Sequence, residues 1–272
     1  MLKTRILTAL LIFPATLAAV FLAPSWLFRI IAAALLLTGG WEFRRLAQLS
    51  PTASLLLLAL QALTIGGMML GWSAVVSAAL PILAVGCACW LPMFYRLHGY
   101  RAGAEPSGRY RTLGFLGAYA AIVSCWFALA WLHDRTGGPL VVFLLLLIIW
   151  AADVGAYFAG RALGRRKLAP SISPNKTWEG VYGGILLALA AAWLWADVIA
   201  GLALPTIELA VMAVVTTSTS VGGDLFISVL KRSVGLKDTG TLFPGHGGVL
   251  DRYDSLLAGA PFFALAYGLF GS

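Results

Sequence analysis

The chain has 272 residues, of which 60% are hydrophobic and only 11% are charged, and its mean hydropathy is +0.90. This composition excludes a soluble globular domain, in which about a quarter of the residues are charged. We therefore expect an all-α, polytopic integral membrane protein. The net charge of +8 suits anionic lipid headgroups or nucleotide phosphates at one membrane face. The dispersal of the basic residues among several loops argues against nucleic-acid binding.

Nine apolar runs are each long enough to cross about 30 Å of hydrocarbon as a helix. They predict spans near residues 6–23, 26–43, 53–70, 73–95, 112–132, 139–160, 179–199, 206–227 and 249–270. A cleaved signal peptide is the alternative for the first run, Lys3 to Ala23, because the run has a basic start and an apolar core. No small-residue cleavage site stands out after it, and its removal would invert the alternation of charge along the chain.

Lysine and arginine residues alternate between the loops as the positive-inside rule requires. Only Arg29 and Arg135 fall on the side that we predict to be external. The pattern predicts an N-terminus inside the cell and a C-terminus outside it. The basic residues of the predicted cytoplasmic side are Lys3, Arg5, Arg44, Arg45, Arg96, Arg101, Arg109, Arg111, Arg161, Arg165, Arg166, Lys167, Lys176, Lys231, Arg232, Lys237 and Arg252.

The two halves of the chain differ in where their acidic residues lie. Residues 1–138 form hydrophobic spans joined by short basic loops, whereas residues 139–272 carry carboxylates within or beside spans. A charge at the centre of a bilayer costs roughly 2.5 to 3.5 kcal/mol on insertion scales, so such residues usually face a polar cavity or a partner. We interpret residues 1–138 as a scaffold and residues 139–272 as the catalytic region. The cysteines Cys87, Cys89 and Cys125 lie inside predicted spans, where we expect buried, unpaired thiols.

One carboxylate, Asp153, lies among small residues in the run WAADVGAY. Small residues let neighbouring helices approach closely. From the local sequence, Asp153 either belongs to a polar site or pairs with an arginine.

A second polar segment, Leu168–Gly184, reads LAPSISPNKTWEGVYGG. Ser173 followed by Pro174 predicts a helix N-cap and first helical residue. Lys176 would then lie in the first turn, where free N–H groups attract phosphate. The alternative is an ordinary capped helix with a snorkelling lysine. Gly180 and Gly184 predict tight packing of the helix that follows.

A third segment, Ser228–Asp254, reads SVLKRSVGLKDTGTLFPGHGGVLDRYD. Asp251 and Asp254 are three residues apart, so on a helix they share one face. With Asp224 from the preceding span, they can surround a hard divalent cation through oxygen atoms, for which Mg²⁺ is the natural candidate. The alternative is a solvated loop of mixed charge, which the density of glycine, carboxylate and lysine disfavours.

The basic residues and glycines of this segment suit a phosphate ligand. Gly245, Gly247 and Gly248 would let the backbone come close to a ligand at the start of the last helix. His246 either binds phosphate or orders the loop by hydrogen bonding. The cations that would balance phosphate oxygens are Lys231, Arg232, Lys237 and Arg252.

The spacing of these residues resembles a family signature. The pattern is Ser228-x-Leu230-Lys231-Arg232, then Lys237-Asp238-x-Gly240, then Phe243-Pro244-x-His246-Gly247-Gly248-Val249-x-Asp251-Arg252-x-Asp254. It resembles the signature of CDP-diacylglycerol synthases, the phosphatidate cytidylyltransferases. The run WAADVGAYFAGRALGRRKLAPSISPNKTWEG resembles the upstream block of that family. Tyr253 departs from the pattern, which has an aliphatic residue, Phe or Thr there, and we expect it to point away from the face of the two aspartates.

The resemblance implies transfer of the cytidylyl group of CTP to phosphatidic acid, giving CDP-diacylglycerol and pyrophosphate in phospholipid biosynthesis. It also implies a Mg²⁺-dependent nucleotidyltransferase with a paired-metal site, in which K⁺ is a candidate second ion. A homodimer in a bacterial cytoplasmic (inner) membrane is expected. Asp224, Asp251 and Asp254 would hold metal, with Asp153 as a further contributor. Lys231 and Lys237 would take part in catalysis, and the expected substrate-binding residues are Ser173, Asn175, Lys176, Thr177, Arg232, His246, Gly247, Gly248 and Arg252.

The position of the site follows from its substrates. CTP arrives from the cytosol while the lipid keeps its acyl chains in the bilayer, so the site should lie just below the cytoplasmic interface and open sideways to lipid.

A CTP-dependent kinase of a membrane alcohol is one alternative function, since it would need the same groups. An ion-coupled transporter is another, because intramembrane acids are common there. Transporters usually carry related binding elements in both halves, whereas here the polar groups crowd the second half.

Overall fold

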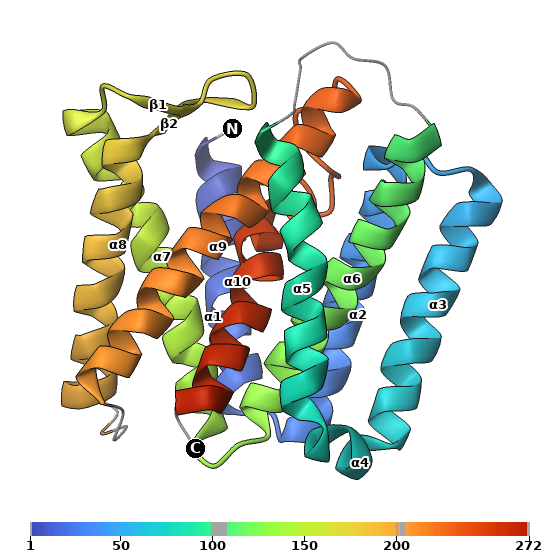
Figure 1. Cartoon of the computed structure of the whole chain (residues 1–272), viewed down its shortest axis with the longest axis horizontal. Helices are drawn as coiled ribbons and strands as arrows, with labels where there is room; N and C mark the ends of the chain where they lie inside the picture. The colour runs from blue at the N-terminus through green and yellow to red at the C-terminus, as the bar shows by residue number, and fades with distance from the viewer. Residues whose placement is uncertain (1, 99–107, 200, 202–204, 271–272) are drawn as a thin grey trace.

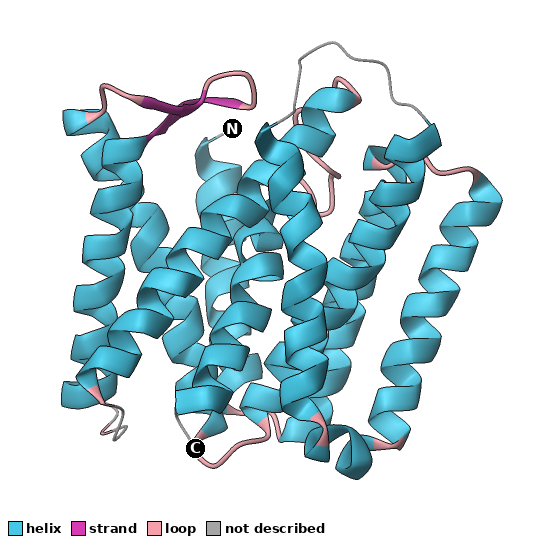
Figure 2. Cartoon of the chain, viewed as in Figure 1, coloured by secondary structure: helices cyan, strands magenta, loops and turns pink. Residues whose placement is uncertain are grey.

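The computed structural model describes residues 2–98, 108–199, 201 and 205–270. Within them the chain is a bundle of long helices with a small hairpin at one end, and the two termini lie at opposite ends of the bundle (Figures 1 and 2). The elements in chain order are α1 (Leu2–Phe21), α2 (Ser25–Leu46), α3 (Pro51–Leu70), α4 (Trp72–Ser77), α5 (Ala79–His98), α6 (Gly108–His133), α7 (Gly138–Leu163), β1 (Lys167–Ala169), β2 (Ser173–Thr177), α8 (Trp178–Trp193), the π-helical turn η1 (Leu194–Ile199), α9 (Thr206–Ser233) and α10 (Leu250–Phe270).

Seven of the described helices, namely α2, α3, α5, α6, α7, α8 and α9, are long and apolar enough to cross a membrane. The predicted multi-pass, helical membrane protein is therefore confirmed. Helices α1 and α10 run along the same bundle (Figure 1). The first turns of α10 carry Asp251, Arg252 and Asp254, and these charges lower its mean hydropathy.

The prediction of one continuous span over residues 73–95 is wrong. The structure has a six-residue helix, α4, that ends at Ser77, and α5 begins at Ala79. Pro81 explains the break, because it has no N–H to donate to the carbonyl of Ser77 and its ring would clash with that carbonyl in a continuous helix.

Helices α7 and α8 pack closely because glycines remove side chains from their contact. A Cβ atom at Gly184 would lie 2.8 Å from the carbonyl oxygen of Ala152, and one at Gly180 would lie 3.0 Å from that of Ala156. A Cβ atom at Gly183 would collide with the Cβ of Ala159. The tight packing expected from Gly180 and Gly184 is confirmed, and it holds Asp153 of α7 beside the start of α8.

We expect Gly183→Ala to destabilise the protein by about 1–3 kcal/mol, because the new methyl group overpacks the contact with α7. Gly66→Ala is the matched control, since a Cβ atom at Gly66 meets nothing within 4 Å. The control should be neutral or stabilising by up to about 1 kcal/mol, because alanine restricts the unfolded chain. Thermal unfolding of both variants in detergent measures the difference, and equal midpoints would contradict the packing argument.

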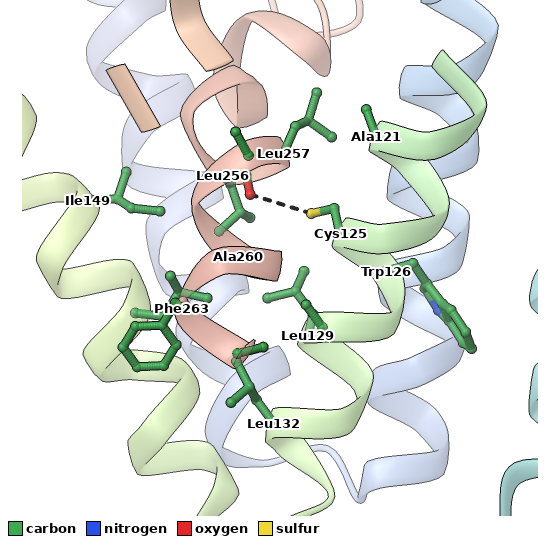
Figure 3. Packing of buried hydrophobic residues seen from close by; sticks show 14 of the residues in the cluster. Ala121, Cys125, Trp126, Leu129, Leu132, Ile149, Leu256, Leu257, Ala260 and Phe263 are labelled. Atoms are coloured by element: carbon green, nitrogen blue, oxygen red, sulfur yellow. Dashed lines mark hydrogen bonds between the residues drawn. The ribbon is translucent and has the colours of Figure 1, made fainter. Parts of the chain in front are cut away.

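The apolar core lies where α6 faces α7 and α10 (Figure 3). Leu257, Ala260 and Phe263 of α10 are fully buried there. Cys125 lies in the same layer and its Sγ donates a hydrogen bond to the carbonyl oxygen of Leu256 at 3.7 Å (Figure 3). Trp126 is buried on the opposite face of α6 (Figure 3), where its Nε1 donates a hydrogen bond to the carbonyl oxygen of Arg29 at 3.0 Å. All three cysteines are unpaired, as the sequence predicted. Cys87 and Cys125 are buried as predicted, whereas Cys89 is only half-buried.

Candidate active site

The segment before α8 forms a strand, so the prediction of an N-cap at Ser173 is wrong. Residues Ser173–Thr177 make β2, which pairs antiparallel with β1. The cap is Thr177, whose hydroxyl oxygen accepts a hydrogen bond from the N–H of Gly180 at 3.1 Å. Pro174 is tolerated on an edge strand, where it need not donate to the ladder. Lys176 therefore reaches the site from the strand and not from the first turn of the helix.

Three of the predicted carboxylates come together inside the bundle. Helices α9 and α10 cross closely at Gly223, where a Cβ atom would lie 2.7 Å from the carbonyl oxygen of Asp254. Asp224, the next residue of α9, interacts electrostatically with Asp254 of α10 and with Asp153 of α7. The carboxylates of three helices thus face a common region.

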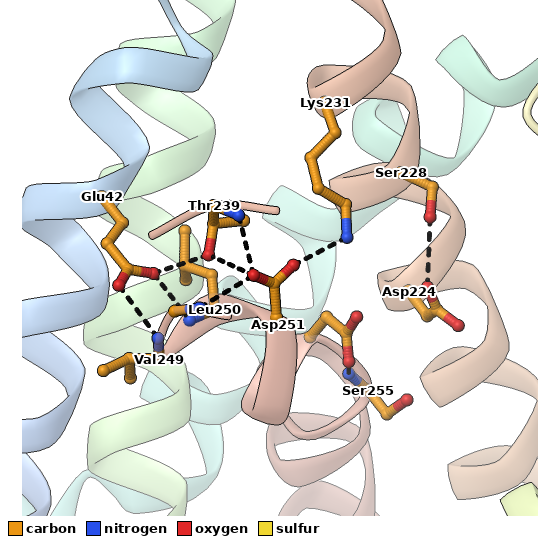
Figure 4. Close-up of polar contacts among 11 residues, drawn as sticks. Glu42, Asp224, Ser228, Lys231, Thr239, Val249, Leu250, Asp251 and Ser255 are labelled. Atoms are coloured by element: carbon orange, nitrogen blue, oxygen red, sulfur yellow. Dashed lines mark hydrogen bonds and ion pairs between the residues drawn. The ribbon is translucent and has the colours of Figure 1, made fainter. Parts of the chain in front are cut away.

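Lys176 is the cation that interacts with all three of these carboxylates. Its Nζ lies 2.5 Å from Oδ2 of Asp224, and it also interacts electrostatically with Asp153 and Asp254. The other oxygen of Asp224, Oδ1, accepts a hydrogen bond from Ser228 at 3.2 Å (Figure 4). Arg252 also interacts electrostatically with Asp153, and Lys231, which is paired with Asp251, interacts with Asp254.

Two cavities meet at Asp153. One, of about 320 Å³, is lined by Asp153, Asp254, Arg252 and His246 among others. The other, of about 240 Å³, is lined by Asp153 together with Asn175, Lys176 and Thr177. Asp153 is exposed and lines both cavities. The larger cavity also contains the acidic side chain of Asp254, whereas the smaller one contains the amide of Asn175 and the ammonium group of Lys176.

Asp251 also lines the larger cavity, but both of its carboxylate oxygens are held by groups of the protein. Its Oδ1 accepts a hydrogen bond from Nζ of Lys231 at 2.8 Å, and its Oδ2 accepts from the N–H groups of Thr239 and Gly248 at 2.7 and 2.9 Å (Figure 4). The side chain of Asp251 is only 5% exposed and that of Lys231 only 15%. The two residues form a largely buried ion pair that ties the end of α9 to the start of α10. The predictions that Asp251 holds metal and that Lys231 takes part in catalysis stay predictions.

The glycines of the last polar segment make room for carboxylates of the protein itself. Gly247 has a positive φ of +84°, and a Cβ atom there would collide with Oδ2 of Asp251. A Cβ atom at Gly248 would collide with both carboxylate oxygens of Glu42. These two glycines were expected to let the backbone approach a ligand, and here the backbone approaches Asp251 and Glu42.

Glu42 of α2 is a site residue that the sequence analysis did not single out. It is 7% exposed and accepts hydrogen bonds from the hydroxyl of Thr239 at 2.7 Å and from the N–H groups of Val249 and Leu250 at 2.9 and 3.0 Å (Figure 4). These N–H groups belong to the start of α10, where a carboxylate is favoured by the helix dipole. The sequence could have identified Glu42 by its position at the end of the predicted span 26–43, because an acid within a span is a candidate site residue.

We expect Glu42→Ala to loosen the connection between α9 and α10. Each hydrogen bond to a charged group contributes about 1.5–3 kcal/mol, and three donors would lose their acceptor. Thermal stability in detergent should fall by a few kcal/mol, and limited proteolysis should cut within residues 239–249. Arg45→Ala, an exposed change in the last turn of the same helix, is the control. A Glu42→Ala protein that resists protease as well as the control does would contradict the anchoring role.

The remaining predicted residues lie around the two cavities or outside them. His246 lines the larger cavity, and its Nδ1 is buried with no hydrogen-bond partner among the described residues. This orphaned nitrogen favours the ligand-binding reading of His246. Arg232 and Lys237 are exposed, and neither lines a cavity described above. Ser173 is half-buried in β2 outside both cavities.

The carboxylates of the site suit a divalent cation that the protein coordinates only in part. Within the described ranges, no three acidic, histidine or cysteine side chains lie close enough to enclose a metal ion. Mg²⁺ is usually bound by one or two carboxylates together with substrate phosphates and water. The carboxylates of Asp153, Asp224 and Asp254 supply oxygen donors of the kind that this mode of binding requires.

Comparisons with known proteins agree with this chemistry. The chain matches the cytidylyltransferase family over residues 3–270. It is 34% identical to a phosphatidate cytidylyltransferase of Haemophilus influenzae over 98% of this chain and 99% of that protein, and 36% identical to one of Pseudomonas aeruginosa over 97% and 96%. A phosphatidate cytidylyltransferase of Bacillus subtilis is 45% identical over 49% of each chain. The protein therefore belongs to the cytidylyltransferase family.

Proposed function

We propose that this protein is a phosphatidate cytidylyltransferase, which transfers the cytidylyl group of CTP to phosphatidic acid and releases pyrophosphate. The observation that carries the proposal is the group of Asp153, Asp224 and Asp254 around Lys176 within a bundle of apolar helices. Such a group collects cations and phosphates at a place that a membrane lipid can reach. The full-length similarity to phosphatidate cytidylyltransferases supports the same activity.

The reaction needs no general base. A phosphomonoester is largely dianionic at neutral pH, with a second pKa near 6, so the lipid phosphate is already a nucleophile towards the α-phosphorus of CTP. The chain must hold two anions together, align them and exclude competing water. Lys176, Arg252 and the unpaired Nδ1 of His246 supply positive or donating groups at the two cavities. Asn175 and Thr177 shape the smaller cavity beside Lys176.

Magnesium would be held by Asp224 and Asp254, with Asp153 as the third contributor. When bound, the ion neutralises phosphate oxygens and stabilises charge on the departing pyrophosphate. K⁺ is the candidate for a second ion. Asp251 and Lys231 act as positioning residues in this scheme, because they hold each other and the loop between α9 and α10. Lys237 and Arg232, which are exposed, would meet the nucleotide only at its outer phosphates.

We place the protein in a bacterial cytoplasmic membrane as a homodimer with nine spans, with its N-terminus inside and its C-terminus outside. Most basic residues belong to the end of the bundle that carries the hairpin and the loop before α10, which supports a cytoplasmic position for that end. Residues 1–138 remain the scaffold and residues 139–272 the catalytic region, with the exception that Glu42 of the scaffold anchors the catalytic loop.

Product identification tests the activity. Detergent-purified protein is incubated with CTP labelled in its base and its γ-phosphate, phosphatidic acid and Mg²⁺, and the labelled products are separated. The proposal requires CDP-diacylglycerol and pyrophosphate. Phosphorylated lipid together with CDP would instead identify a kinase. Uptake of substrate without CTP into vesicles reconstituted with the protein would identify a transporter.

A further inference from the structure

A long apolar cavity lies next to the polar site and has no assigned occupant. Its volume is about 460 Å³, and it runs between α1 and α2 with walls from α6, α7 and α10. Along α1 its lining extends from Ile12 to Val20, and along α2 from Phe28 to Leu36. Eight residues of helix rise roughly 12 Å, so the cavity is elongated along the helix axes.

The apolar cavity and the larger polar cavity share a wall. Ile12, Thr16, Leu146, Tyr253 and Leu256 line both. Tyr253 of α10 and Thr16 of α1 lie at this boundary, and the hydroxyl of Thr16 donates a hydrogen bond to the carbonyl oxygen of Ile12. The polar side of the wall carries Asp254, Arg252 and His246, whereas the other side is lined almost entirely by hydrocarbon.

The cavity opens sideways between α1 and α2. Ala15 of α1 and Ala34 of α2 belong to its lining and are exposed on the outer surface of the bundle. Helix α1 packs only lightly against α2 and α7. Small side chains at the opening and a loosely held helix beside it leave a gap that faces the surrounding membrane.

We propose that this cavity seats one acyl chain of the phosphate-bearing lipid substrate, and that the lipid enters between α1 and α2. The inference rests on the proposed function and names the part of the protein that receives the hydrocarbon. The headgroup phosphate would lie at Arg252 and His246 while the chain descends past Tyr253 towards Val20 and Phe28.

Binding of an acyl chain in this cavity would position the lipid substrate more than it would raise the affinity for it. A lipid tail leaves one apolar environment for another, so little hydrophobic free energy is gained. An acyl chain held along α1 and α2 instead fixes where the phosphate lies, and displacement of a reacting group by about 1 Å can lower the rate about 100-fold. Blocking the cavity should therefore penalise long-chain substrates and spare those too short to reach it.

Substitutions that fill the cavity test the inference by kinetics. We expect Ala19→Phe, inside the cavity, and Ala34→Trp, at its opening, to lower kcat/KM for dioleoyl phosphatidate at least tenfold while leaving dihexanoyl phosphatidate and the KM for CTP unchanged. Ala18→Phe is the matched control, because Ala18 is exposed and lies outside the cavity lining. Wild-type kinetics with dioleoyl phosphatidate, or equal losses with both lipids, would overturn the assignment. Failure of wild-type protein to make any CDP-lipid would instead defeat the proposed function.

Photo-crosslinking gives a second test that needs no variant. Phosphatidate carrying a diazirine in the middle of one acyl chain is bound in the dark and irradiated, and the labelled peptides are sequenced. Label on residues 12–20 and 28–36 supports the inference. Label confined to the outer faces of α3, α5 or α8 would overturn it.

Discussion

Replacing Asp254 or Asp224 by asparagine is expected to lower the rate of CDP-diacylglycerol formation by roughly 10³-fold or more. The two carboxylates interact with each other at the α9–α10 crossing and both interact with Lys176, and Asp224 interacts also with Asp153. An amide of the same shape keeps the packing and removes the negative charge that a divalent cation requires. The rate is measured with saturating CTP and phosphatidate in detergent.

Asp134→Asn is the control for these substitutions. Asp134 lies between α6 and α7 at the other end of the bundle, and its Oδ2 accepts a hydrogen bond from Trp72, a bond that an asparagine oxygen can keep. Its rate should equal that of wild type. Asp254→Asn protein that folds normally and turns over at more than a tenth of the wild-type rate would remove Asp254 from the metal site.

Lys231→Ala is expected to destabilise the folded protein by about 3–5 kcal/mol, because it leaves the carboxylate of Asp251 buried without its cation. The 2.8 Å pair joins α9 to α10, and both side chains are largely inaccessible. The midpoint of thermal unfolding in detergent, with Arg232→Ala as the neighbouring exposed control, measures the loss. Surface changes of that kind usually alter stability by no more than about 0.5 kcal/mol.

A different result would indicate that Lys231 contacts the substrate. If Lys231→Ala unfolds at the wild-type temperature and only raises KM for CTP, the lysine contacts phosphate and the ion pair with Asp251 is dispensable. Loss of stability with nearly unchanged KM in the surviving protein fits the positioning role.

The hydrophobic pattern predicts most of the fold because a bilayer imposes length and polarity on each span. Helices α1, α2, α3, α5, α6, α7, α8, α9 and α10 lie where the apolar runs were found. The break at Ser77 was missed because α4 is as apolar as the helix that follows it. Thr177 was overlooked as a cap because Ser173-Pro174 offers the same local signal four residues earlier, and only pairing with β1 distinguishes them.

The site was harder to predict because distant backbone groups decide what each carboxylate does. Asp251 and Asp254 share a helix face by spacing, yet Asp251 lies in the first turn of α10, where the N–H groups of Thr239 and Gly248 reach it. Asp254 lies one turn further into the bundle and meets Asp224 instead. The partnership of Glu42 with Val249 and Leu250 spans more than two hundred residues, and no local pattern encodes such a contact.

Binding of Mn²⁺, used as a paramagnetic substitute for Mg²⁺, tests the central claim most directly. Electron paramagnetic resonance measures free Mn²⁺ in the presence of purified protein and a non-hydrolysable CTP analogue. Wild-type protein and a folded Asp251→Asn variant should both bind the ion, whereas Asp224→Asn and Asp254→Asn should bind it at least tenfold more weakly. Retained binding in Asp224→Asn and Asp254→Asn, with loss in Asp251→Asn, would contradict the assignment of the metal to the α9–α10 crossing.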